Sequence, residues 1–142
     1  MEIREIGWIV ALLEDGDLQR AGTEVMTDRV VQLFAVAEKT LSPIIGIRGL
    51  DKIQYANLIA VSNHYPWLVA SVESSRQPLK LELLRSVLLE QNAQSVRLAG
   101  SALLHNYYAM LTGLIGLSLT ERLLRSVWEL SSANHAQGMK NG

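Results

Sequence analysis

The side chains in this sequence that are best suited to chemistry are its histidines, because imidazole changes its charge near neutral pH. His105 has the most suggestive neighbours, since Ser101 precedes it by one helical turn and Tyr108 follows it by nearly one. On a helix these residues share a polar stripe along an otherwise apolar segment. We therefore take all three as candidate ligand-binding residues.

A second candidate is Asn63-His64-Tyr65-Pro66-Trp67, where aromatic rings flank an imidazole at a predicted helix end. Such a cluster can line a pocket for an apolar ligand. A packed corner whose polar atoms face water explains the same residues and is the commoner arrangement. We add His64 and Trp67 to the candidate ligand-binding residues and keep both interpretations.

Catalytic and metal-binding patterns are missing from the sequence. It has no cysteine, so disulfides, thiolate nucleophiles and cysteine zinc sites are excluded. No two histidines lie within a helical turn of each other, and the Glu-x-x-His pairs of di-iron bundles are absent. Phosphate-binding glycine loops and the Gly-x-Ser-x-Gly of hydrolases are absent too. We predict a protein that is not an enzyme and holds no metal and no cofactor.

The composition favours a surface that is covered by a partner. Hydrophobic residues make up 49% of the 142 residues and charged residues only 19%, whereas charged residues usually make up about a quarter. We therefore expect a homo-oligomer, with a dimer as the first guess, and we keep open a different protein partner.

The net charge bears on other partners. A formal value of −1 argues against general attraction to nucleic acid or to anionic membranes. Arg122 and Arg125 lie three residues apart on the last predicted helix, which keeps an oligomeric DNA-binding regulator as an alternative. The N-terminus lacks the basic region of a signal peptide. We expect a cytoplasmic protein with no nucleic-acid partner and no membrane association.

Charge is spread unevenly along the chain. Residues 1–40 carry eight acids against four bases, and residues 78–142 carry six bases against four acids. Such an asymmetry can orient head-to-tail contacts between chains, although a solvated surface without a role explains it more simply.

Hydrophobic periodicity predicts an all-α helical bundle of about five or six helices in one domain, residues 1–136, with a flexible tail at 137–142. A long central helix is expected near 79–113, and the polar patch 91–95 is where any break in it should fall. A final helix is expected near 119–136, with a capping box that begins at Ser118.

The first half of the chain contains three further predicted helices. One covers residues 3–13, and a second ends near Lys39 because Pro43 follows it. A third begins at Asp51, which has the pattern of an N-cap. The apolar loop 42–49 between the second and third helices is expected to pack against the body.

One internal similarity is visible in the sequence. Residues 83–87 recur as residues 123–127, a shift of forty. Helical-repeat arrays need three or more copies, so we interpret this as chance similarity between two leucine-rich helices.

The segment from Leu98 to Thr120 contains no charged residue. It is long enough to cross a bilayer, but His105 and Asn106 would lie at its middle, where polar groups are most costly. We therefore predict a central bundle helix. Small side chains recur along it at steps of three and four and form a seam: Ala99, Ala102, Asn106, Ala109, Gly113 and Gly116. Such a seam lets a neighbouring helix approach closely, either from the same chain or from a second copy in a homodimer.

The sequence thus predicts a non-enzymatic helical bundle that acts through protein–protein interaction and self-association. A helical protein that binds a small apolar ligand is the main alternative, and the DNA-binding regulator is the other.

Overall fold

The structure is a computed structural model that describes residues 22–70 and 81–126. Two long helices, α3 (Thr23–Ile45) and α7 (Ala93–Ile115), have 23 residues each. Between them along the chain lie α4 (Ile47–Ser62), the 3-10 turn η1 (Pro66–Leu68) and α6 (Leu81–Leu89). Residues 117–126 form a final helix, and no strand occurs in the described parts of the chain. The predicted all-α bundle is confirmed.

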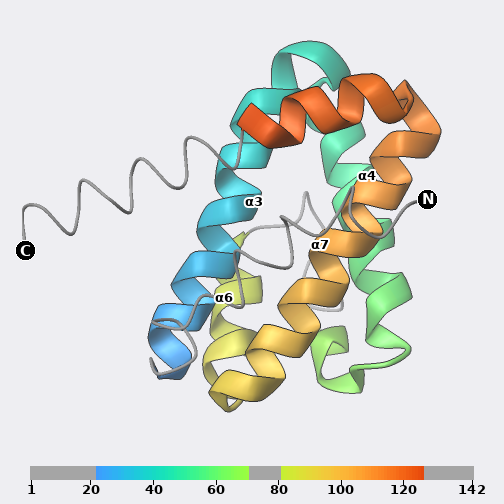
Figure 1. Cartoon of the computed structure of the whole chain (residues 1–142). Helices are drawn as coiled ribbons and strands as arrows, with labels where there is room; N and C mark the ends of the chain where they lie inside the picture. Colours follow the sequence, from blue (N-terminus) through green and yellow to red (C-terminus); the bar gives the residue numbers. More distant parts are fainter. Residues whose placement is uncertain (1–21, 71–80, 127–142) are drawn as a thin grey trace, which may run out of the picture.

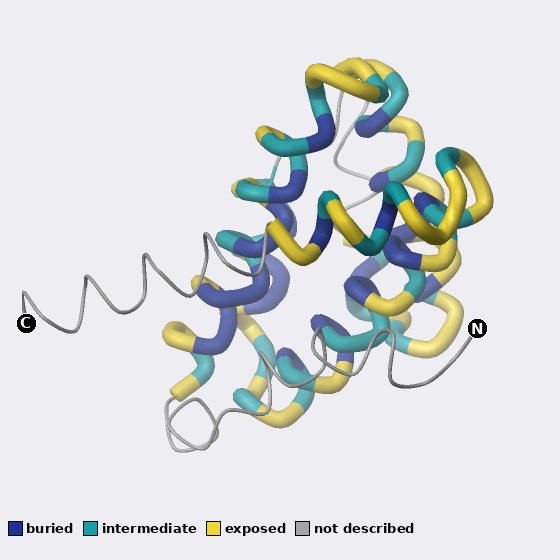
Figure 2. The backbone as a smooth tube through the Cα atoms, turned by 45° about the horizontal axis from the view of Figure 1, so that its top comes forward, coloured by how far each residue is buried: buried dark blue, intermediate teal, exposed yellow. Residues whose placement is uncertain are grey.

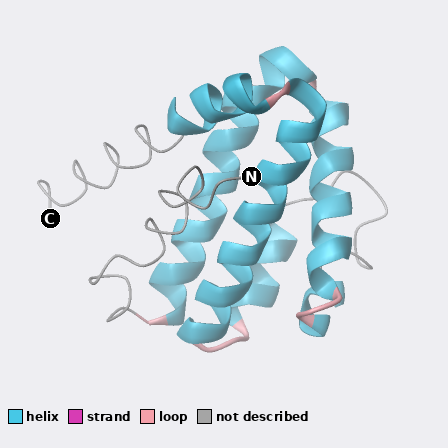
Figure 3. Cartoon of the chain, turned by 45° about the vertical axis from the view of Figure 1, so that its right-hand side comes forward, coloured by secondary structure: helices cyan, strands magenta, loops and turns pink. Residues whose placement is uncertain are grey.

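α3 contacts α4, α6 and α7, and α7 contacts both α3 and α4. In Figure 1, α3 and α7 run in the same direction, α4 returns beside α7, and α6 lies along α3. The final helix crosses over the end of the bundle at which α3 and α7 finish, and Figure 3 shows the short loop from which it starts. No helix among the described residues is long and apolar enough to cross a membrane.

The core consists of aliphatic and aromatic side chains from every one of these helices. Leu41, Leu58, Leu84 and Leu103 are fully buried, and Tyr108 is the largest fully buried side chain. Burying a leucine side chain contributes about 2 kcal/mol by transfer from water. Figure 2 shows the buried positions on the inner faces of the helices and the exposed ones on the outer faces and at the helix corners.

The expectation that Pro43 ends its helix is wrong, because α3 continues to Ile45 with Pro43 inside its last turn. A proline there removes one backbone donor but leaves the other hydrogen bonds of the turn in place. Gly46 ends the helix instead: its φ of 90° and ψ of 149° lie outside the helical region, and its N–H donates to the carbonyl oxygen of Ser42 at 2.9 Å.

The expected start of the helix after α3 was also misplaced. α4 begins at Ile47, so Asp51 lies inside the helix and is not its N-cap. The final helix expected near 119 is present and starts at residue 117, so Ser118 lies inside the helix rather than at its N-cap. The predicted apolar loop 42–49 is helical except at Gly46. Of its three isoleucines, Ile45 packs against the core as expected, whereas Ile44 and Ile47 are 50% and 54% exposed.

The long central helix expected near 79–113 is divided into α6 and α7, and the break falls in the polar patch named as its place. Asn92 is the N-cap of α7, and its side-chain oxygen accepts a hydrogen bond from the N–H of Ser95 at 2.8 Å. An asparagine in this position stabilises a helix start by about 1 kcal/mol, which explains why the chain breaks here.

The structure reveals an internal repeat with a shift of 70 residues. α3 and α7 have equal lengths, and residue 93 follows residue 23 by 70 positions. Both helices end at a glycine with φ 90°, Gly46 and Gly116, and a second helix starts directly after each. From residue 31 to residue 56 the burial classes match those of residues 101–126 at every position except Glu38, whose counterpart is Tyr108. The two halves therefore share one helix-glycine-helix unit.

Three predictions concern residues that the structure does not describe. The helix at 3–13, the tail at 137–142 and the end of the final helix all lie outside the described residues.

Candidate protein-interaction surface

Each half of the repeat turns a corner at its glycine, and the two corners have the same backbone geometry. Gly46 and Gly116 have ψ values of 149° and 157° at the same φ of 90°, a region that is essentially restricted to glycine. The N–H of Leu50 donates to the carbonyl oxygen of Gly46 at 3.0 Å, and the N–H of Thr120 donates to that of Gly116 at 3.1 Å. Both corners lie at the same end of the bundle (Figure 1).

Four large aliphatic side chains at these corners are exposed to solvent. Ile44 and Ile47 flank Gly46 and are 50% and 54% exposed, while Leu114 and Leu117 flank Gly116 and are 59% and 38% exposed. We call these four residues the corner surface. A single exposed leucine needs no explanation, but here a pair of exposed aliphatic side chains flanks each of two equivalent corners at the same end of the bundle (Figure 1), and exposed apolar patches often mark binding sites.

The repeat makes the exposure of these residues informative. Residues 41, 45 and 46 are identical to residues 111, 115 and 116. Leu41 and Leu111 are fully buried, so core packing explains why a leucine occurs at both positions. Ile44 and Ile47 correspond to Leu114 and Leu117, so an aliphatic side chain is kept at both exposed positions in both halves. Other exposed positions differ, such as Arg48 and Ser118. Packing does not account for an apolar side chain kept at an exposed position, which favours a role in binding.

Exposed basic side chains lie on the helices that meet at the two corners. Within the described ranges, the exposed lysines and arginines all lie in the second half of α3, the start of α4 and the final helix: Lys39, Arg48, Lys52, Arg122 and Arg125. Arg125 forms an ion pair with Glu121 at 2.8 Å. The carboxylates in the same region, Glu38, Asp51 and Glu121, are only half-exposed. Among the described residues, the exposed charge at this end of the bundle is therefore mainly positive.

An open groove borders each corner. One, of about 340 Å³, lies between α3 and α6 and is lined by Pro43, Ile47 and Leu81 among others. The other, of about 410 Å³, follows the final helix from Ser118 to Ser126. Both grooves are partly open to solvent, and the described residues that line the second one all lie on the final helix.

Glu38 lines the first groove, and its surroundings disfavour its charge. Burial, and to a smaller extent the negative charge of Asp51, raise the pKa of the Glu38 carboxyl above its ordinary value. Burial, and to a smaller extent the negative charge of Glu38, also raise the pKa of the Tyr107 phenol. The ring of Tyr107 packs edge-on against Phe34, with 5.4 Å between the centroids. These groups join α3 to α7 beneath the groove.

The predicted polar stripe of α7 is divided by burial. His105 is exposed and Ser101 is half-buried, whereas Tyr108 is fully buried. The hydroxyl oxygen of Ser101 has no hydrogen-bond partner among the described residues. The stripe therefore does not present one continuous polar surface to a ligand.

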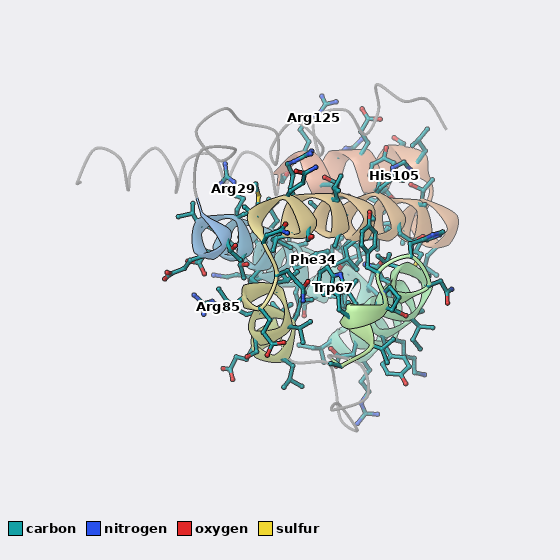
Figure 4. All side chains as sticks on the ribbon, turned by 90° about the horizontal axis from the view of Figure 1, so that it is seen from below. Arg29, Phe34, Trp67, Arg85, His105 and Arg125 are labelled. Atoms are coloured by element: carbon teal, nitrogen blue, oxygen red, sulfur yellow. The ribbon has the colours of Figure 1, made fainter. Side chains whose placement is uncertain are left out.

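The second set of candidates lies elsewhere. His64 is exposed in the turn after α4, and Trp67 is half-buried in η1, where its ring meets that of Tyr65 edge-on with 6.2 Å between the centroids. His105 and Trp67 lie on opposite sides of α7 in Figure 4. The structure therefore does not bring the two sets of candidate ligand-binding residues together, and ligand binding at either set stays a prediction.

The predicted seam of small residues changes its surroundings along α7. Ala99 is fully buried, and Ala102 and Asn106 are half-buried. Ala109, Gly113 and Gly116 are exposed and lead into the corner surface. The first half of the seam thus packs inside the chain, and only the second half is accessible to a second copy. Self-association through the seam stays a prediction.

Asn106, a member of the seam, belongs to a buried polar network between α7 and α4. Its side-chain nitrogen donates to Oδ1 of Asn57 at 2.9 Å. Asn57 is completely buried, and its Nδ2 donates to Oε1 of Gln54 at 3.0 Å and to the carbonyl oxygen of Leu103 at 3.1 Å. With three hydrogen bonds, Asn57 is well satisfied, so the network has a structural explanation.

Other kinds of site find little support. In residues 22–70 and 81–126, no group of three His, Asp or Glu side chains is placed to hold a metal ion. Arg122 and Arg125 are exposed on the final helix, and DNA binding through them stays a prediction. The chain matches no family model, and searches of curated proteins and of solved structures gave no significant match.

Sequence reasoning missed the corner surface because it treated residues 42–49 as a loop. A usable signal was present: Ile-Ile-Gly-Ile at 44–47 and Leu-Ile-Gly-Leu at 114–117 share the same pattern of aliphatic residues around glycine. Aligning these two segments gives the shift of 70 residues directly.

Proposed function

We propose that this chain is a non-enzymatic protein-interaction module and that its corner surface binds an apolar segment of a protein. The supporting observation is that both halves of the repeat keep exposed aliphatic side chains at equivalent positions, Ile44 with Leu114 and Ile47 with Leu117. Burying one such side chain in an interface contributes about 1.5–3 kcal/mol before the costs of association. Two pairs of such side chains, one pair at each corner, and the exposed bases on the same helices support binding of an apolar segment at this end of the bundle.

The test is site-specific photo-crosslinking in cells that express the full chain. A photo-reactive amino acid replaces Ile47 or Leu117 in the corner surface, or Tyr55 or Ile59 on α4 as controls. The control positions match in exposure, because both are 43% exposed. We expect discrete crosslinked products from positions 47 and 117 and none of comparable yield from 55 and 59. Equal products from all four positions, or none from the corner surface, would refute the proposed function.

A further inference from the structure

The two ends of the bundle differ in the sign of their exposed charge. The basic end carries the exposed lysines and arginines around the corner surface. In the described part of the chain, the exposed carboxylates all lie in the first two turns of α3, in α6 and directly after α6: Glu24, Asp28, Glu82 and Glu90. Asp28 forms an ion pair with Arg85 at 2.7 Å. The start of α3 and the turn from α6 to α7 lie at the end of the bundle opposite the glycine corners (Figure 1).

This opposite end also exposes aliphatic side chains. Val25 in the first turn of α3, Leu89 at the end of α6 and Leu98 in the second turn of α7 are 49%, 37% and 41% exposed. Glu24 and Glu90 directly adjoin two of them in the sequence. We call these five residues the acidic end. Among the described residues, each end of the bundle therefore combines exposed aliphatic side chains with an excess of exposed charge of one sign.

We propose that the corner surface binds the acidic end of a second copy of this chain, so that copies associate head to tail. The inference rests on the proposed function and names its partner. Apolar side chains meet apolar side chains in this contact, and Arg48, Lys52 and Arg122 approach carboxylates. A symmetric contact between two corner surfaces would instead bring these bases together, and like charges across an interface are unfavourable. The low charge content of the chain, 19%, agrees with a surface that copies cover for one another.

A head-to-tail contact has a consequence for the size of the assembly. Each chain that uses its corner surface still has a free acidic end, so association continues until a ring closes or a filament forms. Sedimentation velocity should therefore show species beyond a dimer as the concentration rises. Because the exposed charges are screened by salt, association should weaken as the ionic strength is raised.

Charge reversal at the two ends tests the arrangement. The basic-end variant carries Arg48→Glu and Arg122→Glu, and the acidic-end variant carries Glu24→Arg and Glu90→Arg. None of these four side chains forms an ion pair with another described residue, so both variants should keep their helicity, which circular dichroism checks. Sedimentation velocity is measured for the wild-type chain, for each variant and for an equimolar mixture of the two variants.

We expect each variant alone to associate about tenfold more weakly than the wild type, because each places like charges across the contact. The mixture should recover association, since the intact acidic end of one variant meets the intact basic end of the other. Normal association of the acidic-end variant alone would overturn the head-to-tail arrangement. A wild-type chain that stays monomeric up to about 1 mM would also overturn it. If crosslinks from positions 47 and 117 to another protein persist in that case, the proposed function still stands.

Discussion

The side-chain amide of Asn106 donates a hydrogen bond to Oδ1 of Asn57 at 2.9 Å and so connects α7 to α4 inside the bundle. The two residues are 49 positions apart in the sequence. Because Asn57 is completely buried and also bonds to Gln54 and to the backbone of Leu103, this contact fixes how the two helices pair. Buried polar groups stabilise a fold when all of them are satisfied, and they are costly when a partner is removed.

Replacing Asn57 with alanine should therefore destabilise the protein by about 1–3 kcal/mol, because Asn106 and the Leu103 carbonyl lose a buried partner. Urea denaturation of the full chain measures the change. Asn63→Ala serves as the control, since Asn63 is exposed at the end of α4, and it should change the free energy of unfolding by less than about 0.5 kcal/mol. Equal effects of the two substitutions would contradict the structural role of the network.

Two glycines near the end of α7, Gly113 and Gly116, should respond to alanine substitution with stability changes of opposite sign. Gly116→Ala should cost about 1–3 kcal/mol, because an alanine is strained at φ 90° and ψ 157°. Gly113 lies inside α7, and nothing comes within 4 Å of a Cβ added there. Gly113→Ala should therefore stabilise the protein by up to about 1 kcal/mol through higher helix propensity. Thermal unfolding distinguishes the two variants, and a stable Gly116→Ala chain would show that the corner geometry is not required.

The buried phenol of Tyr107 predicts how stability depends on alkaline pH. Burial and the charge of Glu38 raise the pKa of Tyr107 above its ordinary value of 10.0. The folded state then holds the phenolic proton more tightly than the unfolded state does. The contribution of the neutral Tyr107 phenol to the free energy of unfolding is therefore present below pH 10.0 and is lost as the pH rises further. Between about pH 9 and about pH 11, the unfolding midpoint should fall more steeply in the wild type than in Tyr107→Phe.

The control for this measurement is Tyr55→Phe, because Tyr55 is 43% exposed. That variant should follow the wild-type pH profile. If Tyr107→Phe loses stability with pH as steeply as the wild type, the phenol of Tyr107 is not the group that makes the fold sensitive to alkali.

Much of the fold follows from local patterns in the sequence. Helical periodicity predicts the all-α class, and the polar patch around Asn92 predicts the break between α6 and α7, because asparagine caps a helix start through its own side chain. Pro43 misled the prediction of where α3 ends. A proline signal is strong in sequence, but a glycine three residues later set the actual boundary through its backbone conformation.

The candidate surface was harder to predict because it depends on comparing distant parts of the chain. The segments 41–47 and 111–117 share few identical residues, while the repeated Leu-Leu-Arg-Ser-Val drew attention to a shift of forty instead. The pairing of Asn57 with Asn106 carries no local signal at all. His105 drew attention by its residue type, but only the structure shows that Tyr108, its neighbour on the predicted stripe, faces the core.

The central claim is that the exposed aliphatic residues of the corner surface serve binding rather than folding. The direct measurement is the crosslinking yield from a photo-reactive residue at position 114, compared between the wild-type background and Ile47→Ser/Leu117→Ser. The yield should fall about tenfold, while circular dichroism should show that the double variant is folded, because Ile47 and Leu117 are 54% and 38% exposed. An undiminished yield in a folded double variant would contradict the claim.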